Sequence, residues 1–296
     1  MTHKTTKPKY LITGATGKTG TLVTEQLRAK GANVRAMVRK IDARSDRLTK
    51  LGAEVVIGDF YDLTSLKAAM TDIEGVYFCY PAAGDRLLEA AANVAIAAKE
   101  KGVSRVVDMS QISALETAKS PLSYQHWQAE QVLDWADVGA VHIRPTFFAE
   151  DLYLFTGGQV KKTGQVVLPF GQGRHAPIAA NDIAAVVVAL LKDPKSHIGE
   201  RLVLTGPESL DMATLTKRMG AHFGLDLAYV DVPVEAWQQA LYGLPGFSSA
   251  LIEHLGAVAL DHQVGIFDAE TSVVEDLTGR APEKLEAFIE RNRDYF

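Results

Sequence analysis

The chain lacks the features that mark several classes of protein. Its 296 residues include one cysteine, Cys79, so no disulfide can form within the chain. No run of about 18 apolar residues is present, which argues against a transmembrane helix. The basic start of the chain has no apolar stretch of the kind a secretory signal needs. We therefore expect a cytoplasmic protein that does not enter membranes.

An excess of positive charge is also missing. The formal net charge is −5, whereas a general nucleic-acid binder is usually basic, so we expect no nucleic-acid partner. Hydrophobic residues make up 47% of the chain and charged residues 23%, which is typical of a soluble globular enzyme. The length suffices for one large domain or for two smaller ones.

The first half of the chain alternates two patterns. Short runs rich in β-branched residues (10–14, 33–39, 53–59, 75–80, 104–110 and 140–145) are separated by longer Ala- and Leu-rich segments. This alternation predicts an α/β fold with a doubly wound parallel sheet of the Rossmann type. After Pro145 the pattern breaks, and a smaller C-terminal α/β substrate lobe is expected. We assign 1–150 to the Rossmann domain, with 174–206 packing back onto it, and 151–173 and 207–296 to the lobe.

A glycine-rich turn lies between the first predicted strand and the first predicted helix. In "YLITGATGKTG", Gly14 permits the tight turn, Gly17 lets the backbone approach a pyrophosphate, and Gly20 lets the helix pack closely. The N-terminus of the following helix offers N–H groups and a positive dipole end to phosphates. We expect this loop to bind a dinucleotide, with contributions from its other residues Thr16, Lys18 and Thr19.

The second predicted strand ends in residues that bear on the choice of cofactor. NAD binders commonly place an acid here for the ribose hydroxyls, whereas an arginine accommodates the additional phosphate of NADP. Arg39 and Lys40 occupy this place, and Asp42 follows slightly late. The pattern therefore favours NADP(H), and NAD(H) stays open.

Further cofactor contacts are expected at the ends of the third and fourth strands, because ligands bind at the carboxyl ends of parallel strands. Asp59 and Phe60 fall where an adenine ring would lie. Tyr80 and Pro81 would lie near the middle of the cofactor.

Together these motifs resemble the NmrA-like branch of the atypical short-chain dehydrogenase/reductases. The resemblance rests on "ITGATGKTG", "GDFYD", "IRPTFFAEDL", "GQGRHAPIAANDIA" and "LTGPE", on a histidine and a glutamate four residues apart, and on their order along the whole chain. It implies a Rossmann domain with a small substrate lobe and an NADP cofactor. Members of this branch include NADPH-dependent reductases of quinones, azo dyes, triphenylmethanes and imines, and also NADP-binding regulators.

The stretch "SPLSYQHWQAEQ" departs from the pattern of ordinary short-chain dehydrogenases. Those enzymes use a serine after the fifth strand and a tyrosine followed four residues later by a lysine, which lowers the pKa of the tyrosine. Ser110 and Tyr124 are present, but Gln128 stands at the lysine position. Ser110 and Tyr124 are candidate catalytic residues, and Ser110 also a cofactor contact, without the electrostatic help of a lysine.

His126 is the other candidate for proton donation, because the ordinary pKa of histidine lies near physiological pH. Glu130 is four residues further on, so on a helix the two share a face and the carboxylate could orient the imidazole. The resemblance implies that this histidine lies near the nicotinamide. The alternative is an ordinary pair on a helix face with no catalytic role. A metal site is not expected, because two ligands on one helix are too few.

Aromatic residues after the sixth strand predict the substrate wall. Phe147 and Phe148, with Phe170 further on, would suit a flat substrate, although many such residues belong to ordinary core. We expect a reductase of small, planar, electrophilic compounds such as quinones, azo compounds or imines. The alternatives are a redox-sensing NADP(H)-binding regulator and a tailoring enzyme of secondary metabolism. The sequence leaves open whether the chain forms a homodimer.

Overall fold

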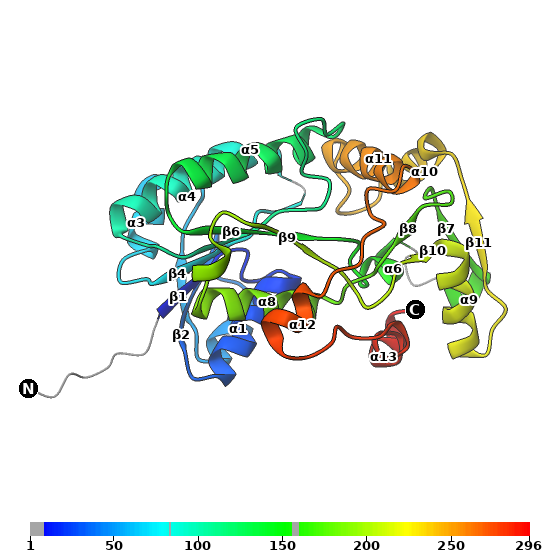
Figure 1. The fold of residues 1–296 in the computed structure, drawn as a ribbon, viewed down its shortest axis with the longest axis horizontal. Coiled ribbons are helices and arrows are strands. Elements are labelled where there is room, and N and C mark those ends of the chain that lie inside the picture. The colour runs from blue at the N-terminus through cyan, green and yellow to red at the C-terminus, as the bar shows by residue number, and fades with distance from the viewer. Residues whose placement is uncertain (1–8, 83, 156–159) are drawn as a thin grey trace, which may run out of the picture.

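The computed structural model describes residues 9–82, 84–155 and 160–296. One parallel sheet forms the centre of the molecule (Figure 1). Its strands, in chain order, are β1 (Lys9–Ile12), β2 (Asn33–Val38), β3 (Glu54–Ile57), β4 (Gly75–Phe78), β5 (Val106–Met109), β6 (Ala140–Pro145) and β9 (Arg201–Leu204). The spatial order is β3-β2-β1-β4-β5-β6-β9, and every described pairing is parallel. The predicted doubly wound fold is confirmed.

Helices cover both faces of this sheet, as Figure 1 shows. One layer holds α3 (Leu63–Ala69), α4 (Leu87–Lys101) and α5 (Pro121–Trp135). The other holds α1 (Lys18–Ala29), α8 (Ala180–Lys192) and α12 (Val273–Thr278), while α2 (Ala43–Lys50) follows β2. The order reverses between β1 and β4, because the chain passes from β3 at one edge back to β4 beside β1. The carboxyl ends of these two strands therefore flank the crevice in which such sheets bind ligands.

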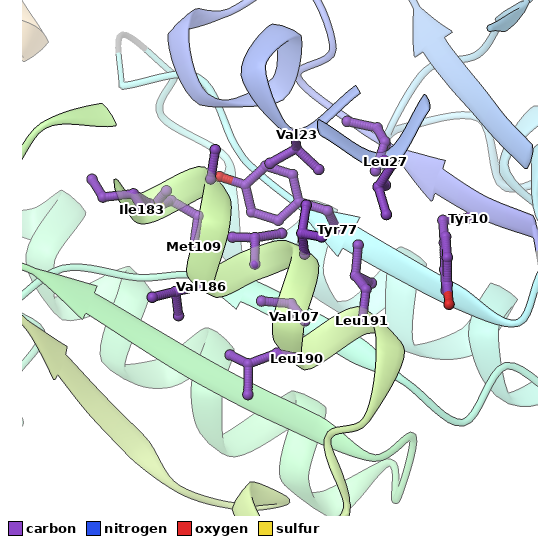
Figure 2. Close-up of a cluster of buried hydrophobic side chains, with 14 of the residues drawn as sticks. Tyr10, Val23, Leu27, Tyr77, Val107, Met109, Ile183, Val186, Leu190 and Leu191 are labelled. Carbon is purple, nitrogen blue, oxygen red and sulfur yellow. The ribbon is translucent and has the colours of Figure 1, made fainter. Parts of the chain in front are cut away.

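The buried core explains why the strands are apolar on both faces. Tyr77 and Val107, on β4 and β5, face the layer of α1 and α8, where Val23, Ile183 and Leu190 pack against them (Figure 2). On the other face, a second cluster includes many alanines of α4, whose small side chains let the helix lie close to the sheet. A strand that is buried on both faces has no solvent-facing side, so its sequence does not alternate between apolar and polar residues.

The second lobe holds most of the remaining elements. They are α6 (Asp151–Leu154), α7 (Val160–Thr163), β7 (Gln165–Leu168), β8 (Arg174–His175), β10 (Leu210–Asp211), α9 (Met212–Phe223), β11 (Ala228–Asp231), α10 (Val234–Leu241), α11 (Ser249–Gln263), α13 (Leu285–Arg291) and the 3₁₀ turn Arg293–Tyr295. The other 3₁₀ turn, Lys195–His197, lies between α8 and β9 of the Rossmann domain. β7 pairs with β11 in parallel, and β8 pairs with β10 antiparallel. A separate cluster of buried side chains forms the core of this lobe.

Two segments cross the boundary that the sequence suggested. Of residues 174–206, α8 and β9 pack into the Rossmann domain, but β8 pairs with β10 of the lobe. The tail also returns: α12 packs against α8, and Val274 is fully buried in the Rossmann core. The residues of α12 therefore belong with the sheet, because their apolar side is covered by α8.

Candidate functional site

The glycine turn after β1 has the geometry expected for a phosphate-binding loop. Gly14 adopts a φ of +55°, and a Cβ there would lie 2.9 Å from the carbonyl oxygen of Cys79. A Cβ on Gly20 would lie 2.3 Å from the carbonyl oxygen of Gly14, so only glycine lets α1 approach the turn this closely. The amide of Gly17 donates to the carbonyl of Gly14 at 2.8 Å and closes the loop.

The N-terminus of α1 differs from those of α2, α3 and α5 in having no side-chain cap. Gly17 occupies the N-cap position and provides no side-chain acceptor, whereas Asp42, Asp62 and Ser120 cap α2, α3 and α5. The first N–H groups of α1 are therefore left for another acceptor. A pyrophosphate placed at this exposed turn would accept these bonds and benefit from the helix dipole.

Two side chains of the loop have partners within the protein. The hydroxyl of Thr19 lies 2.8 Å from that of Tyr77 in the core, so only its backbone is available to a phosphate. Lys18 is paired with Asp151 of the second lobe at 3.4 Å. Thr16 stays partly exposed at the turn.

The end of β2 presents free positive charge. Arg39 and Lys40 are exposed and have no hydrogen-bond or ion-pair partner among the described residues. Asp42, the acid that the sequence places slightly late, caps α2 by accepting from the amide of Arg44, and it also binds the Arg44 guanidinium at 2.7 Å. The hydrogen bonds from Arg44 lower the pKa of Asp42 to about 2. Its carboxylate is thus committed to the helix rather than free to bind ribose hydroxyls.

The loops after β3 and β4 meet at the carboxyl edge of the sheet. Asp59 accepts from the amide of Tyr61 at 2.9 Å, and Phe60 packs edge-on against Phe78 with ring centres 5.4 Å apart. The hydroxyl of Tyr80 lies 2.7 Å from that of Tyr61. Phe60 and Tyr80 form a partly buried aromatic wall beside the crevice, and Pro81 next to them is exposed. Contact of these residues with a cofactor stays a prediction.

The stretch "SPLSYQHWQAEQ" forms the opening turns of α5. Ser120 is the N-cap and accepts from the amide of Ser123, while Pro121 occupies the first helical position. The stretch therefore begins a well-formed helix whose N-terminus lies at the carboxyl edge of the sheet. It also carries Tyr124 and His126 toward that edge.

Glu130 does not orient His126, contrary to our expectation. It is completely buried and accepts from Ser110 Oγ at 2.6 Å, from Arg144 at 2.9 and 2.6 Å, and from Arg201 at 3.3 Å. The hydroxyl proton of Ser110 is thus bound to Glu130 and is not free for a substrate. A role for Ser110 in proton donation would require this bond to break.

His126 is held in its neutral form. Its Nδ1 is buried, neither ring nitrogen has a hydrogen-bond partner among the described residues, and burial lowers its pKa to about 3. The positive charge of Arg144 and the neighbouring His254 act in the same direction. A neutral imidazole can donate a hydrogen bond, but at neutral pH it is not the acid that the ordinary histidine pKa suggests.

Tyr124 has no base or cation bound to its hydroxyl among the described residues. Its side chain is 37% exposed, and the ring stacks on Trp127 with centres 5.5 Å apart. No described residue makes a hydrogen bond to its hydroxyl. The three expected proton donors are thus a serine bound to a carboxylate, a neutral histidine and an unassisted tyrosine.

A buried charge network beside this site was not foreseen from the sequence. His142 lies between Asp108 at 2.9 Å and Asp134 at 3.1 Å, and Arg201 binds both Asp134 and Glu130. Burial alone would lower the pKa of His142, but the bonds to Asp108 and Asp134 outweigh it and raise the pKa to about 9. The only signal in the sequence was a set of charged residues inside apolar strands, where an unpaired charge would be costly.

Two of the three predicted substrate residues are buried. Phe147 and Phe170 are 4% and 2% exposed, and their rings pack edge-on 5.6 Å apart in the core of the second lobe. His175 and His262 pack around them, with His262 stacked 4.0 Å from Phe170. The structure therefore places these two phenylalanines in core packing rather than on an open wall. Phe148 is partly buried against the Rossmann core, and its contact with substrate stays a prediction.

Two further observations concern the described part of the chain. No group of three or more His, Cys, Asp or Glu side chains among these residues is placed to hold a metal ion. No described helix is long and apolar enough to cross a membrane.

The fold and the glycine turn define a dinucleotide-binding protein of the Rossmann type. A family model described as NAD(P)H-binding matches residues 14–194, and the chain belongs to this family. The match includes the glycine turn, both loops of the carboxyl edge and α5. The resemblance drawn from the motifs is confirmed at this level, and the cofactor class is NAD(P)H.

Three comparisons show what the chain is similar to. It is 27% identical to an NAD(P)H azoreductase of Xenophilus azovorans over 291 residues, which are 97% of this chain and 98% of that protein. An NADPH-dependent quinone oxidoreductase from Escherichia coli, solved with NADPH, has a TM-score of 0.82 at 23% identity and covers 96% of this chain and 99% of its own.

The transcriptional regulator NmrA, solved with NADP, has a TM-score of 0.79 at 15% identity and covers 95% of this chain and 94% of its own. At these identities the structural likenesses concern the fold. Enzymes and a regulator both occur on it, so the site must distinguish between them.

Proposed function

We propose that the protein is an NADPH-dependent reductase of small, planar, electron-poor organic compounds, such as quinones, azo compounds or imines. When bound, the reduced nicotinamide supplies a hydride, and the oxidised cofactor leaves with one electron pair fewer. The similarity to an azoreductase along the whole chain supports an enzyme over a regulator. What carries the proposal is the state of Ser110, Tyr124 and His126, which together lack a competent proton donor.

A site of this kind suits substrates that need no acid. Reduction of an ordinary ketone requires a proton donor as the oxygen gains charge, which the tyrosine and lysine of short-chain dehydrogenases supply. A quinone, an azo group or an iminium accepts hydride readily, and water can then supply any proton. The protein positions the reactants and excludes bulk solvent, while the cofactor carries the reaction.

The cofactor is expected to be NADPH rather than NADH. Arg39 and Lys40 are unpaired at the place where the 2′-phosphate would lie, and the nearby carboxylate of Asp42 is bound to Arg44 and to the start of α2. An arginine without a competing partner can bind phosphate through two parallel hydrogen bonds. NADH lacks that phosphate and would leave this charge unused.

The experiment that tests the proposal follows NADPH oxidation against quinones, azo dyes and cyclic imines, with an ordinary ketone as the comparison. The proposal expects saturable turnover with the first three classes and none with the ketone. Tight NADPH binding with no turnover in any class would instead support the regulator. Turnover confined to the ketone would show that a proton donor has been missed.

A further inference from the structure

Several polar atoms beside α5 have no hydrogen-bond partner among the residues that the structure describes. The atoms Gln111 Nε2, Ser123 Oγ and His126 Nδ1 are buried without a hydrogen bond to any described residue. Buried polar groups in folded proteins are nearly always paired, so a concentration of unpaired ones within residues 111–126 needs an explanation. A bound ligand would supply the missing partners.

These polar groups lie at the edge of the cofactor crevice. Ser110 directly follows β5, which neighbours β4 at the reversal of strand order, so this loop borders the half of the crevice beyond the glycine turn. Ser110 is bound to Glu130 on α5, and His126 lies one turn earlier on the same face of that helix. Gln111, next to Ser110, is thereby held at the same edge of the sheet as His126.

The second lobe closes this group through α11. His254 of α11 accepts from or donates to the hydroxyl of Ser120 at 2.7 Å, which ties α11 to the first turn of α5 (Figure 1). Asp261, two turns further along α11, is 6% exposed, and burial raises its pKa, although a hydrogen bond from Ser113 and the positive charge of Lys119 act against this. Residues from both lobes therefore border the unpaired groups.

The charges around the group determine what it can bind. His126 and His254 are both neutral at physiological pH, because burial lowers their pKa values to about 3 and about 4. Arg144 is bound to Glu130, and Lys119 lies opposite Asp261. An anionic ligand would find no free buried cation among the described residues of this group and would face Asp261, whereas a neutral ligand meets neutral donors.

We propose that Gln111 and His126 form a pair of neutral hydrogen-bond donors for the acceptor atom of an uncharged planar substrate. This inference rests on the proposed function and adds the substrate's charge and two residues that recognise it. The electron pair that arrives with the hydride ends on that acceptor atom, and water supplies the proton. Donors held in place by the fold would stabilise the growing charge on that atom without rearrangement.

The first test compares two substrates on the unaltered protein. 1,4-Naphthoquinone and its 2-sulfonate have the same ring system, and the sulfonate is the more electrophilic of the two. The inference expects a kcat/KM at least about tenfold higher for the uncharged quinone, against the order of intrinsic reactivity. An equal or higher value for the sulfonate would overturn the inference while leaving the reductase in place.

The second test removes one donor. Gln111→Met keeps the length of the side chain and removes its N–H groups, and we expect kcat/KM for 1,4-naphthoquinone to fall about 100-fold with NADPH affinity unchanged. Calorimetry of naphthoquinone binding to the NADP⁺-loaded protein should show weaker binding in parallel. Gln131→Met, on α5, serves as the control because its amide already donates to the carbonyl of Trp127.

The outcomes separate the inference from the function on which it rests. Unchanged turnover and binding in Gln111→Met would overturn the donor role while the reductase stands. Absence of both turnover and quinone binding in the unaltered protein would overturn both proposals. If Gln111→Met fails to fold, the substrate comparison still decides, because it needs no variant.

Discussion

The hydroxyl of Ser110 donates to the carboxylate of Glu130 across 2.6 Å, and both side chains are buried. This bond joins the loop after β5 to the middle of α5, and it removes the serine proton from the site. Ordinary short-chain dehydrogenases, from which this sequence departs, use a serine at this place in their active site. Here it is a structural partner of a buried acid.

The first prediction concerns that acid. Glu130→Gln would leave Arg144 and Arg201 facing a neutral amide in a buried network. Breaking a buried ion pair in this way typically costs about 3–5 kcal/mol, so we expect the free energy of unfolding in urea to fall by this order. Glu116→Gln, at an exposed position, is the control and should change little. A loss below about 1 kcal/mol, the scale of exposed pairs, would show that the network contributes no more than a surface salt bridge.

The second prediction concerns pH. Burial lowers the pKa of His175 to about 4, and neither of its ring nitrogens has a hydrogen-bond partner in the part of the chain that the structure describes. The unfolded chain, with an ordinary histidine pKa near 6.5, therefore binds more protons between about pH 6.5 and pH 4 than the folded one. Stability should fall as the pH drops through this window.

His175→Phe tests the origin of this acid sensitivity, because a phenyl ring suits the surrounding aromatic core. Urea unfolding at pH 7 and pH 5 should show a smaller difference between the two values in the variant than in the unaltered protein. For His142 we expect the opposite dependence of stability on pH. Its pKa is raised to about 9, so its contribution to the free energy of unfolding is lost only as the pH rises toward that value. The same difference in both proteins would exclude His175 as the cause.

The third prediction concerns the glycine turn. Gly20→Ala would place a methyl group against the backbone of Gly14, which cannot move aside as a flexible side chain could. We expect the turn to open and NADPH affinity, followed by fluorescence titration, to fall by at least about tenfold, a loss of roughly 1.4 kcal/mol. Lys30→Ala, at the far end of α1, is the control. Normal affinity in Gly20→Ala would mean that the turn does not hold the pyrophosphate.

The fourth prediction concerns the choice between the two cofactors. Arg39→Ala removes an unpaired cation at the end of β2 and should weaken NADPH binding about tenfold or more, with little effect on NADH. Calorimetric titration of both cofactors measures this. Equal losses for NADPH and NADH would place Arg39 elsewhere than at the 2′-phosphate.

The sequence predicted the parts of the molecule that depend on local pattern. The glycine spacing located the turn because strand, glycines and helix follow one another directly, and apolar runs located the strands of the sheet. The pairing of Glu130 could not be predicted, because its partners Ser110, Arg144 and Arg201 come from three different strands or their ends. Helical spacing suggested His126 as the partner of Glu130, but Glu130 instead pairs with arginines that are distant in the sequence.

The same limit applies to the substrate residues. Phe147 and Phe170 are aromatic residues in a Gly-rich segment, and nothing local distinguishes a pocket wall from a lobe core. In the structure, the rings of His175 and His262 pack around them, which places both phenylalanines in the core of the lobe. Gln111 carries no motif, and it stands out only because the fold buries its amide nitrogen without a partner among the described residues.

The central claim is hydride transfer to an electron-poor substrate without a proton donor from the protein. Its most direct test is a single-turnover measurement with 1,4-naphthoquinone and NADPH deuterated at the transferring position of the nicotinamide, in H₂O and in D₂O. The account predicts a clear slowing with deuterated NADPH, little additional effect of D₂O, and no change in rate as the pH rises from 5 to 8. A large D₂O effect together with a pH-dependent rate would contradict it, because a titrating group of the protein would then move a proton in the same step.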